Sequence, residues 1–332
     1  MKDRGTALIS ALLTVALMSA LAVELVDNAR FSLARSSNIQ DRDQAYWHAR
    51  GAREFAEQLL SASVGGADEI MRPSDPWVVQ SDQTFPIEDG VLVGRIEDGN
   101  NCFNINTLLP DVSSNEDDPA ALTAEQAGRS FTALMDGLAM PPGVTESVRA
   151  QIIDWIDADA FARPGGAEDR DFARFSPPYR AANQRFVELE EILALPVMTP
   201  ALFAALEPWL CVRPEAVRLP VNVNTLRIDQ APLLAAALHG ELTLADAETV
   251  LFRRPVQGYE DLAEFWADPL MALVLEQSSA PALQSAVTLR SRWFEIDVDV
   301  RLRTTRFSLE TLAVMDDQGR LQRRSQRFGS VS

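Results

Sequence analysis

The feature that most constrains this chain is an unbroken apolar stretch close to its start. Two basic residues lie before Gly5, and residues 6–23 carry no charge until Glu24. Eighteen such residues reach the lower end of the length that crosses a bilayer core as a helix. Because neither glycine nor proline occurs between residues 6 and 50, nothing in the sequence ends the helix where a membrane would end.

Helical periodicity continues beyond the apolar stretch. Ala45, Ala49 and Ala56 are separated by four or seven residues, and charged residues fall largely between them, as expected for one apolar helix face. We therefore expect a single helix over about residues 6–62, roughly 85 Å long at about 1.5 Å per residue. Its first half is apolar all round, and its second half is amphipathic.

A secretory signal peptide is the alternative for this stretch, since residues 19–22 offer a small-residue cleavage site. The length of the apolar run and the periodicity that continues through the supposed cut argue against it. A soluble protein exported in this way would begin near Val23 after cleavage.

Composition excludes some partners. The 332 residues carry a net charge of −18, whereas nucleic acid and anionic lipid both need a basic surface. We expect most of these acids to be solvated, and the excess also favours cation binding. The two cysteines, Cys102 and Cys211, have no metal-ligand spacing. A long-range disulfide in an oxidising compartment and two buried free thiols both remain open.

Strand-like segments occur in two groups separated by a long helical region. We expect strands at residues 77–80, 84–87, 91–96 and 102–105, and again at 293–303, 306–315 and 321–328. Between them the sequence predicts helices at 123–139, 145–156, 186–194, 199–210, 229–238, 243–252, 259–266 and 269–275. The chain is therefore α+β, with a long N-terminal helix packed on a small antiparallel sheet and a large all-α domain inserted between strands.

These patterns divide the chain into regions. Residues 64–106 and 285–332 form the sheet, and residues 107–284 form the insert. A five-residue pattern, N-x-N-T-L, occurs at residues 104–108 and again at 222–226. Asparagine and threonine bond readily to nearby backbone, so we expect a structural role for both copies. The repeat can also mark two related halves of the insert, residues 107–220 and 221–284.

A cluster of acidic residues is the main candidate for a functional site. Asp157 and Asp159 follow an apolar helix, and Glu168, Asp169 and Asp171 come after a Gly-Gly turn. Carboxylates brought together repel one another unless a cation neutralises them, and oxygen ligands in a flexible loop suit calcium. An EF-hand is rejected, because Phe161 and Ala162 occupy its fifth and sixth places. A solvated acidic loop is the alternative.

Catalytic patterns are few. The sequence contains no G-x-S-x-G, Walker A or dinucleotide-binding glycine motif. Of the two histidines, His48 is expected to pack against the sheet. Asp157 and Asp159 have the residue types of a carboxylate-dependent hydrolase, but nothing else supports one. We therefore expect a protein that is not an enzyme.

The start of the chain resembles the leader and first helix of type IV pilins and type II secretion pseudopilins. In that family the leader is cut after the glycine on the cytoplasmic side, which implies processing between Gly5 and Thr6. Residues 1–5 are then the leader, residues 6–26 the membrane-spanning half of the helix, and residues 27–63 its amphipathic half. Most members carry glutamate at the fifth place after the cut, where this chain has Ser10.

Lacking that glutamate is characteristic of the minor pseudopilin K family of the general secretion pathway, and in this the chain resembles that family. D-W-I-D-A-D, G-G-A-E-D, P-P-Y-R-A-A-N and N-V-N-T-L follow one another as in the helical insert of that family, which binds calcium through acidic loops. The resemblance implies calcium ligands among Asp157, Asp159, Glu168, Asp169 and Asp171, with Asn183 a weaker candidate. This sequence departs from the family at Ala158, Phe172 and Ala181, where no carboxylate is involved.

The resemblance also implies a function. A member of this family caps the tip of the type II secretion pseudopilus, initiates its assembly and serves the export of folded proteins. Its expected partners are minor pseudopilins I and J, the major pseudopilin, the prepilin peptidase and the inner-membrane secretion platform. We expect a single pass through the bacterial inner membrane, with the body in the periplasm. The alternative is a membrane-anchored or exported periplasmic calcium-binding protein or hydrolase.

Overall fold

The structure is a computed structural model, and it describes most of the chain. The described residues are 3–64, 69–79, 82–110, 122–214, 218–277, 280–316 and 318–329; the side chains of residues 3–7, 277 and 280 are outside this description. Gly5 and Thr6 therefore lie on a described helix, but their side chains are not described.

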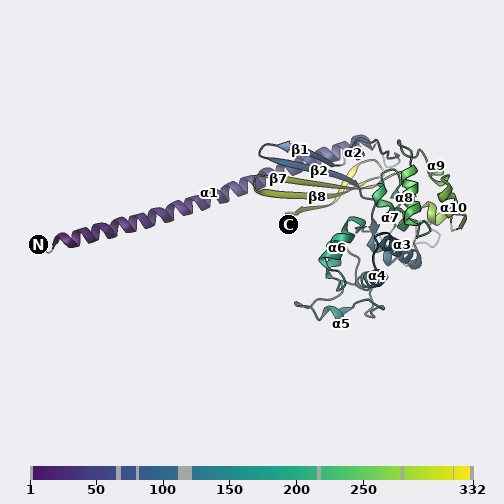
Figure 1. Ribbon diagram of the computed structural model, residues 1–332, viewed down its shortest axis with the longest axis horizontal. Coiled ribbons are helices and arrows are strands. Elements are labelled where there is room, and N and C mark those ends of the chain that lie inside the picture. Colours follow the sequence, from purple (N-terminus) through teal and green to yellow (C-terminus); the bar gives the residue numbers. More distant parts are fainter. Residues whose placement is uncertain are drawn as a thin grey trace.

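The predicted long helix is confirmed. Helix α1 (Asp3–Ser63) runs for 61 residues without a break, and Figure 1 shows its first part projecting away from the rest of the molecule. The large apolar side chains between residues 8 and 39 are exposed, whereas Ala45, Ala49 and Leu60 are fully buried against the body. The change from bare to buried follows the sequence, because only the second half carries a one-sided apolar face.

The body of the molecule begins with a five-stranded antiparallel sheet, in the order β1-β2-β7-β8-β9. Its strands are β1 (Asp82–Ile87), β2 (Gly90–Asp98), β7 (Trp293–Leu302), β8 (Thr305–Met315) and β9 (Leu321–Gly329). β2 and β7 are neighbours, although the whole insert separates them in sequence. Alternate residues of β7, including Ile296 and Val298, are buried in the core that α1 covers. The predicted α+β fold is confirmed.

The insert lies at the end of the sheet farthest from the N-terminus (Figure 1) and has a hydrophobic core of its own. Its helices are α3 (Ala124–Gly137), α4 (Pro142–Ile156), α5 (Asp169–Phe172), α6 (Pro200–Leu206), α7 (Ala231–Ala237), α8 (Leu244–Arg253), α9 (Leu262–Trp266), α10 (Pro269–Gln277) and α11 (Ala280–Gln284). Short 3-10 turns are η1 (Ile105–Leu108), η2 (Leu189–Ala194), η3 (Glu207–Trp209) and η4 (Ile228–Gln230). α5 and α11 were not predicted, because each is only one turn long.

Two predicted strands are different in the structure. The segment expected as a strand at 77–80 contains helix α2 (Pro76–Val79), and Gln80 lies outside the described residues. Proline is favoured at the first position of a helix, and the periodicity of so short an apolar run cannot separate helix from strand. The strand expected at 102–105 is reduced to β3 (Phe103–Asn104), which is outside the main sheet and pairs in parallel with β4 (Leu210–Cys211).

The N-x-N-T-L repeat has the structural role that was predicted. Beside β3 and β4, a second short parallel pair joins β5 (Val221–Asn222) to β6 (Val287–Thr288). In both copies the first asparagine side chain accepts a hydrogen bond from the backbone N–H two residues later, at 3.3 Å in one and 3.0 Å in the other. Each copy therefore forms a tight turn that leads from a strand into a helical region.

Candidate functional site

The acidic site is built where α4 ends. The apolar face of α4 packs into the insert core through Val148 and Ile152, which fixes the position of its last turn. Asp157 follows as the C-terminal cap with an extended backbone, φ −70° and ψ 167°. The chain then turns away from the helix and returns at Glu168, immediately before α5.

Asp154 holds the returning loop in place. This carboxylate is fully buried on α4. Its Oδ2 accepts hydrogen bonds from the N–H groups of Arg163 and Ala167 at 3.1 and 3.0 Å, and its Oδ1 lies 2.6 Å from Arg163 Nη1. A Cβ at Gly166 would lie 1.8 Å from Asp154 Oδ2, so only glycine fits there. Sequence reasoning missed Asp154, although it belongs to the same D-W-I-D-A-D stretch as Asp157 and Asp159.

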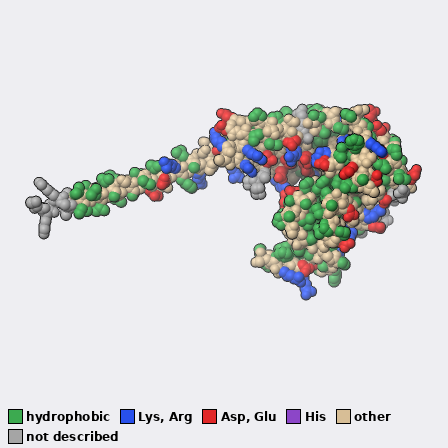
Figure 2. Space-filling model, in the orientation of Figure 1, with side chains coloured by type: hydrophobic (Ala, Val, Ile, Leu, Met, Phe, Trp, Pro, Cys, Tyr) green, Lys and Arg blue, Asp and Glu red, His purple; other side chains and the backbone are tan. Residues whose placement is uncertain are grey.

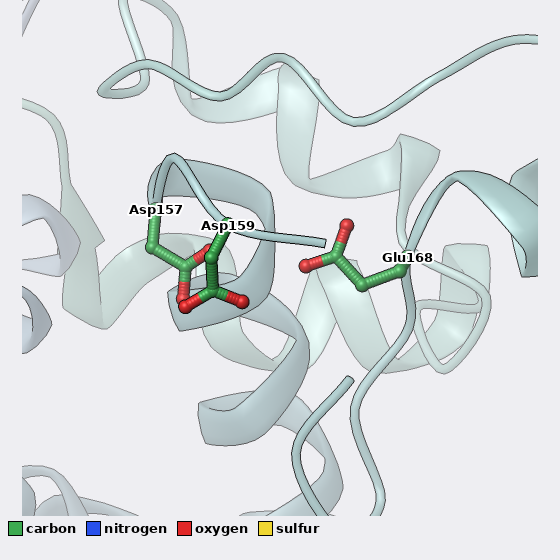
Figure 3. A group of neighbouring side chains, drawn as sticks. All are labelled: Asp157, Asp159 and Glu168. Carbon is green, nitrogen blue, oxygen red and sulfur yellow. The ribbon is translucent and has the colours of Figure 1, made fainter. Parts of the chain in front are cut away.

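Three of the five predicted metal ligands lie close together. One carboxylate oxygen from each of Asp157, Asp159 and Glu168 lies within 4.8 Å of the others. Figure 3 shows Glu168 reaching from the segment immediately before α5 toward Asp157 and Asp159, which follow the end of α4. Asp157 and Glu168 are buried, and Asp159 is exposed. Burial first, and then the charges of Asp154 and Asp157, raise the pKa of Glu168 above its usual value.

The donor set fits calcium. Asp157 Oδ1 and Glu168 Oε1 are buried and have no hydrogen-bond partner among the described residues. A buried carboxylate oxygen without a partner is costly, and a cation would satisfy both. All the ligands are oxygens on a loop, which suits calcium better than zinc or copper. Arg163 competes for part of this role, because its Nη1 also contacts Asp157 Oδ2.

The other predicted ligands lie outside this group of three. Asp169 Oδ1 accepts a hydrogen bond from the N–H of Ala181 at 3.0 Å, and Asp171 Oδ2 accepts one from the N–H of Glu168 at 3.3 Å. Both carboxylates therefore stabilise the fold around α5. Asn183 has a positive φ of 48° and donates its N–H to Trp155 O at 3.0 Å.

Cys102 and Cys211 are joined by a disulfide in the structure, with their Cα atoms 5.8 Å apart. The bridge lies at the parallel pair of β3 and β4, where Asn104 is opposite Cys211. It therefore closes the first half of the insert at its two ends. Of the two alternatives left open by the sequence, the structure contains the disulfide.

A buried serine–histidine pair lies elsewhere in the insert. His239 Nδ1 is 2.7 Å from Ser130 Oγ, and its Nε2 is 3.2 Å from Arg218 Nη1. Burial, followed by Arg218 and Arg129, lowers the pKa of His239 to about 4. A guanidinium only donates, so Nε2 accepts from Arg218 and Nδ1 donates to the serine. This imidazole has no free position for the serine proton, and the pair is not arranged as a nucleophile and base.

Comparisons with known proteins agree on one family. Two models described as "Type II secretion system (T2SS), protein K" match residues 101–215 and 221–288. The type II secretion system protein K of Aeromonas hydrophila is 30% identical over 324 residues, covering 96% of this chain and 95% of its own length. That of Pectobacterium carotovorum subsp. carotovorum is 29% identical over 317 residues, covering 96% and 94%.

A solved structure is also similar. It is a chain of the GspK-GspI-GspJ complex of the type 2 secretion system from enterotoxigenic Escherichia coli. The TM-score is 0.73 at 26% identity, and the match covers 89% of this chain and 99% of that one. The likeness therefore includes both the sheet and the helical insert.

Proposed function

The chain belongs to the type II secretion system protein K family, and from this premise we propose that it is the minor pseudopilin at the tip of the pseudopilus. Its proposed partners there are minor pseudopilins I and J, because the similar solved chain belongs to a GspK-GspI-GspJ complex. In this role the protein is not an enzyme. It acts in the initiation of assembly and in the export of folded proteins across the outer membrane.

The bare half of α1 is the observation that carries this proposal. The helix that includes Leu8–Ser63 is long and apolar enough to cross a membrane, and its apolar part is not buried inside the molecule. Figure 2 shows apolar side chains along the projecting helix. Such a surface needs a bilayer or other apolar helices around it. A single-pass inner-membrane anchor with a periplasmic body supplies the bilayer, and a pseudopilus supplies the helices.

Two features support a place at the tip. The insert is at the end of the body opposite the membrane anchor (Figure 1), where a subunit stacked above would meet it. In addition, Ser10 stands where most relatives of the pilin type carry glutamate. A buried carboxylate is costly without a partner. A subunit that has no other subunit above it offers no such partner, and so it has no need of that charge.

Mass spectrometry of the mature N-terminus tests the pseudopilin reading. Cleavage by a prepilin peptidase leaves Thr6 as the first residue, carrying an added methyl group. Replacing Gly5 with valine should abolish this cleavage and leave the full-length chain in the membrane. A mature protein that begins near Val23 and is released from the membrane would contradict the proposal.

We also propose that Asp157, Asp159 and Glu168 bind calcium. The two buried oxygens without partners support this, as does the mutual repulsion of the carboxylates. A ligand present at 100 times its Kd stabilises a protein by about 2.7 kcal/mol, so a chelator should lower the melting temperature.

Matched variants make this test specific. Asp159→Asn should abolish the effect of the chelator, because it removes the exposed carboxylate of the group. Asp169→Asn should retain it, because that carboxylate lies outside the group and accepts the N–H of Ala181. An unchanged melt in the wild type, together with no calcium binding by titration calorimetry, would remove the proposed site.

A further inference from the structure

A largely buried arginine lies where the two halves of the insert meet. Arg218 precedes β5, and burial lowers the pKa of its guanidinium to about 10. Its Nη2 donates to Ala282 O at 2.7 Å and to Ser285 Oγ, and its Nη1 donates to His239 Nε2 at 3.2 Å. These acceptors are all neutral, and Arg218 forms no ion pair within the described part of the chain. A buried charge without an opposite charge is costly.

Two hydrogen-bond donors beside this charge lack an acceptor. The Nε–H of Arg218 is buried and has no partner among the described residues. The Ser130 hydroxyl accepts the N–H of His239 Nδ1 at 2.7 Å, which leaves its own proton to donate. No second contact of this hydroxyl occurs in the part of the chain that the structure describes. Since an unused buried donor costs stability, the position needs an acceptor.

A small cavity offers the space for one. Arg218 and Ser130 both line a cavity of about 30 Å³, whose other walls include the apolar side chains of Phe103, Leu233 and Ala237. A single water molecule needs roughly 10–15 Å³ of such a cavity. The space therefore suits water or an anion of one atom, and it is too small for phosphate.

The charge around the cavity favours an anion over water. The whole chain has a net charge of −18, but the charged groups that shift the pKa of His239 are Arg218 and Arg129, and both lower it. The local potential is therefore positive. Arg129 pairs with Glu241 at 2.9 Å, which leaves Arg218 as the cation to be neutralised. Water would satisfy the two donors, whereas an anion would satisfy them and also compensate the guanidinium.

We propose that this cavity binds a chloride ion, held by the Nε–H of Arg218 and the hydroxyl of Ser130. Ser130 belongs to α3 in the first half of the insert, whereas His239 and Ala282, which contact the same guanidinium, belong to the second half. The ion stabilises the junction of the two halves, because it neutralises the cation around which they meet. This site concerns the stability of the insert and goes beyond the proposed function.

Thermal unfolding of the full chain in detergent tests the ion. At pH 7 and constant ionic strength, replacing sodium gluconate with sodium chloride should raise the melting temperature, and the rise should saturate as the site fills. Equal melting temperatures in the two salts would overturn the proposal and leave water as the occupant. A rise that never saturates would indicate a general effect of salt and would overturn it as well.

Variants locate the site. Arg218→Gln should abolish the saturable rise, and Ser130→Ala should lower the apparent affinity for chloride by at least about tenfold, on the scale of 1.4 kcal/mol per factor of ten. Arg254→Gln is the matched control and should respond as the wild type does. Arg254 is also half-buried, but its Nη1 donates to Val223 O and Leu226 O at 2.7 and 2.6 Å, and it does not line this cavity.

Ser130→Ala keeps the test decisive if Arg218→Gln does not fold. An unchanged affinity for chloride in Ser130→Ala would overturn the proposal, because the serine hydroxyl would then not bind the ion. A response to chloride that Arg254→Gln loses and Arg218→Gln retains would place the ion elsewhere in the insert and overturn it too.

Discussion

The two halves of the insert share one framework, but only the first contains the acidic site. Asn106 in the first half and Asn224 in the second make equivalent contacts. Asn106 Oδ1 accepts the N–H of Phe186 at 3.0 Å, and its Nδ2 donates to the carbonyls of Phe186 and Arg213. Asn224 Oδ1 accepts the N–H of Tyr259 at 2.8 Å, and its Nδ2 donates to Tyr259 and Met71. The repeated motif is therefore structural, and the acidic loop is a feature of one half.

The halves also differ in how they attach to the sheet. The first half uses ion pairs: Arg327 of β9 contacts Glu188 and Glu190 of the insert, and Arg213 of the insert contacts Glu295 of β7 at 2.8 Å. Figure 2 shows acidic and basic side chains together in the hollow between sheet and insert. The second half uses a buried carboxylate, Asp98, which accepts hydrogen bonds from Thr225 and Ser291. One attachment is therefore charged and partly exposed, and the other is buried.

The largest expected effect tests whether the two frameworks are equivalent. Asn106→Ala and Asn224→Ala each remove three hydrogen bonds and leave buried backbone groups without partners. At about 1–3 kcal/mol for each buried group, we expect each variant to lose about 3–5 kcal/mol of unfolding free energy. Urea unfolding measures the loss. Losses that differ by more than about 2 kcal/mol would show that the two motifs are not equivalent.

The next effect should be confined to the first half. Cys102 and Cys211 are 109 residues apart in sequence, and losing a disulfide that closes so long a loop typically costs about 2–4 kcal/mol. The paired variant Cys102→Ser, Cys211→Ser should increase amide hydrogen exchange in α4 and leave α7 and α8 protected, together with α3, which packs on α7. Equal deprotection of both halves would mean that the insert unfolds as one unit.

Much of this fold follows from local sequence patterns. The apolar periodicity of α1 predicts its full length, and the strands predicted at 293–303, 306–315 and 321–328 agree with β7, β8 and β9 almost to the residue. α3 begins with a capping box of Thr123 and Gln126, the T-x-x-Q pattern that marks a helix start in a sequence. What local patterns do not determine is pairing between distant segments. The sequence pattern of the segment that contains β3 predicts one more strand of the sheet. β3 belongs to the insert because it pairs with β4, which lies about one hundred residues later in the chain.

The sequence predicts that the candidate site is built from carboxylates of this loop, but not which of the carboxylates come together. Sequence alone cannot separate Glu168 from Asp169 and Asp171, because all three follow the same Gly-Gly turn. The distinction arises when α5 forms: the first turn of that helix directs Asp171 back to the N–H of Glu168. Asp169 is occupied by a hydrogen bond from the N–H of Ala181. Glu168 keeps a buried oxygen without a partner among the described residues and faces Asp157 and Asp159.

The smallest effect tests the charged attachment through the pH dependence of its own carboxylate, Asp297. Asp297 of β7 faces the hollow beside Glu295, Glu310, Glu97 and Arg95. Burial, and then the three glutamates, raise the pKa of Asp297 to about 7 from an ordinary value of 3.8. The folded state holds this proton more tightly than the unfolded state does. The contribution of Asp297 to the free energy of unfolding is therefore complete below about pH 4 and is lost as the pH rises toward 7.

Asp297→Asn should remove this loss and be more stable than the wild type above pH 7. We expect the stability difference between variant and wild type to change by about 1–2 kcal/mol between pH 5 and 8. Thr225→Val, which removes the hydrogen bond to Asp98 in the other attachment, should destabilise the protein without restoring stability at high pH. If Asp297→Asn and the wild type keep the same stability difference from pH 5 to 8, the charged attachment does not titrate in this range. The contrast between the two attachments would then lie in burial alone.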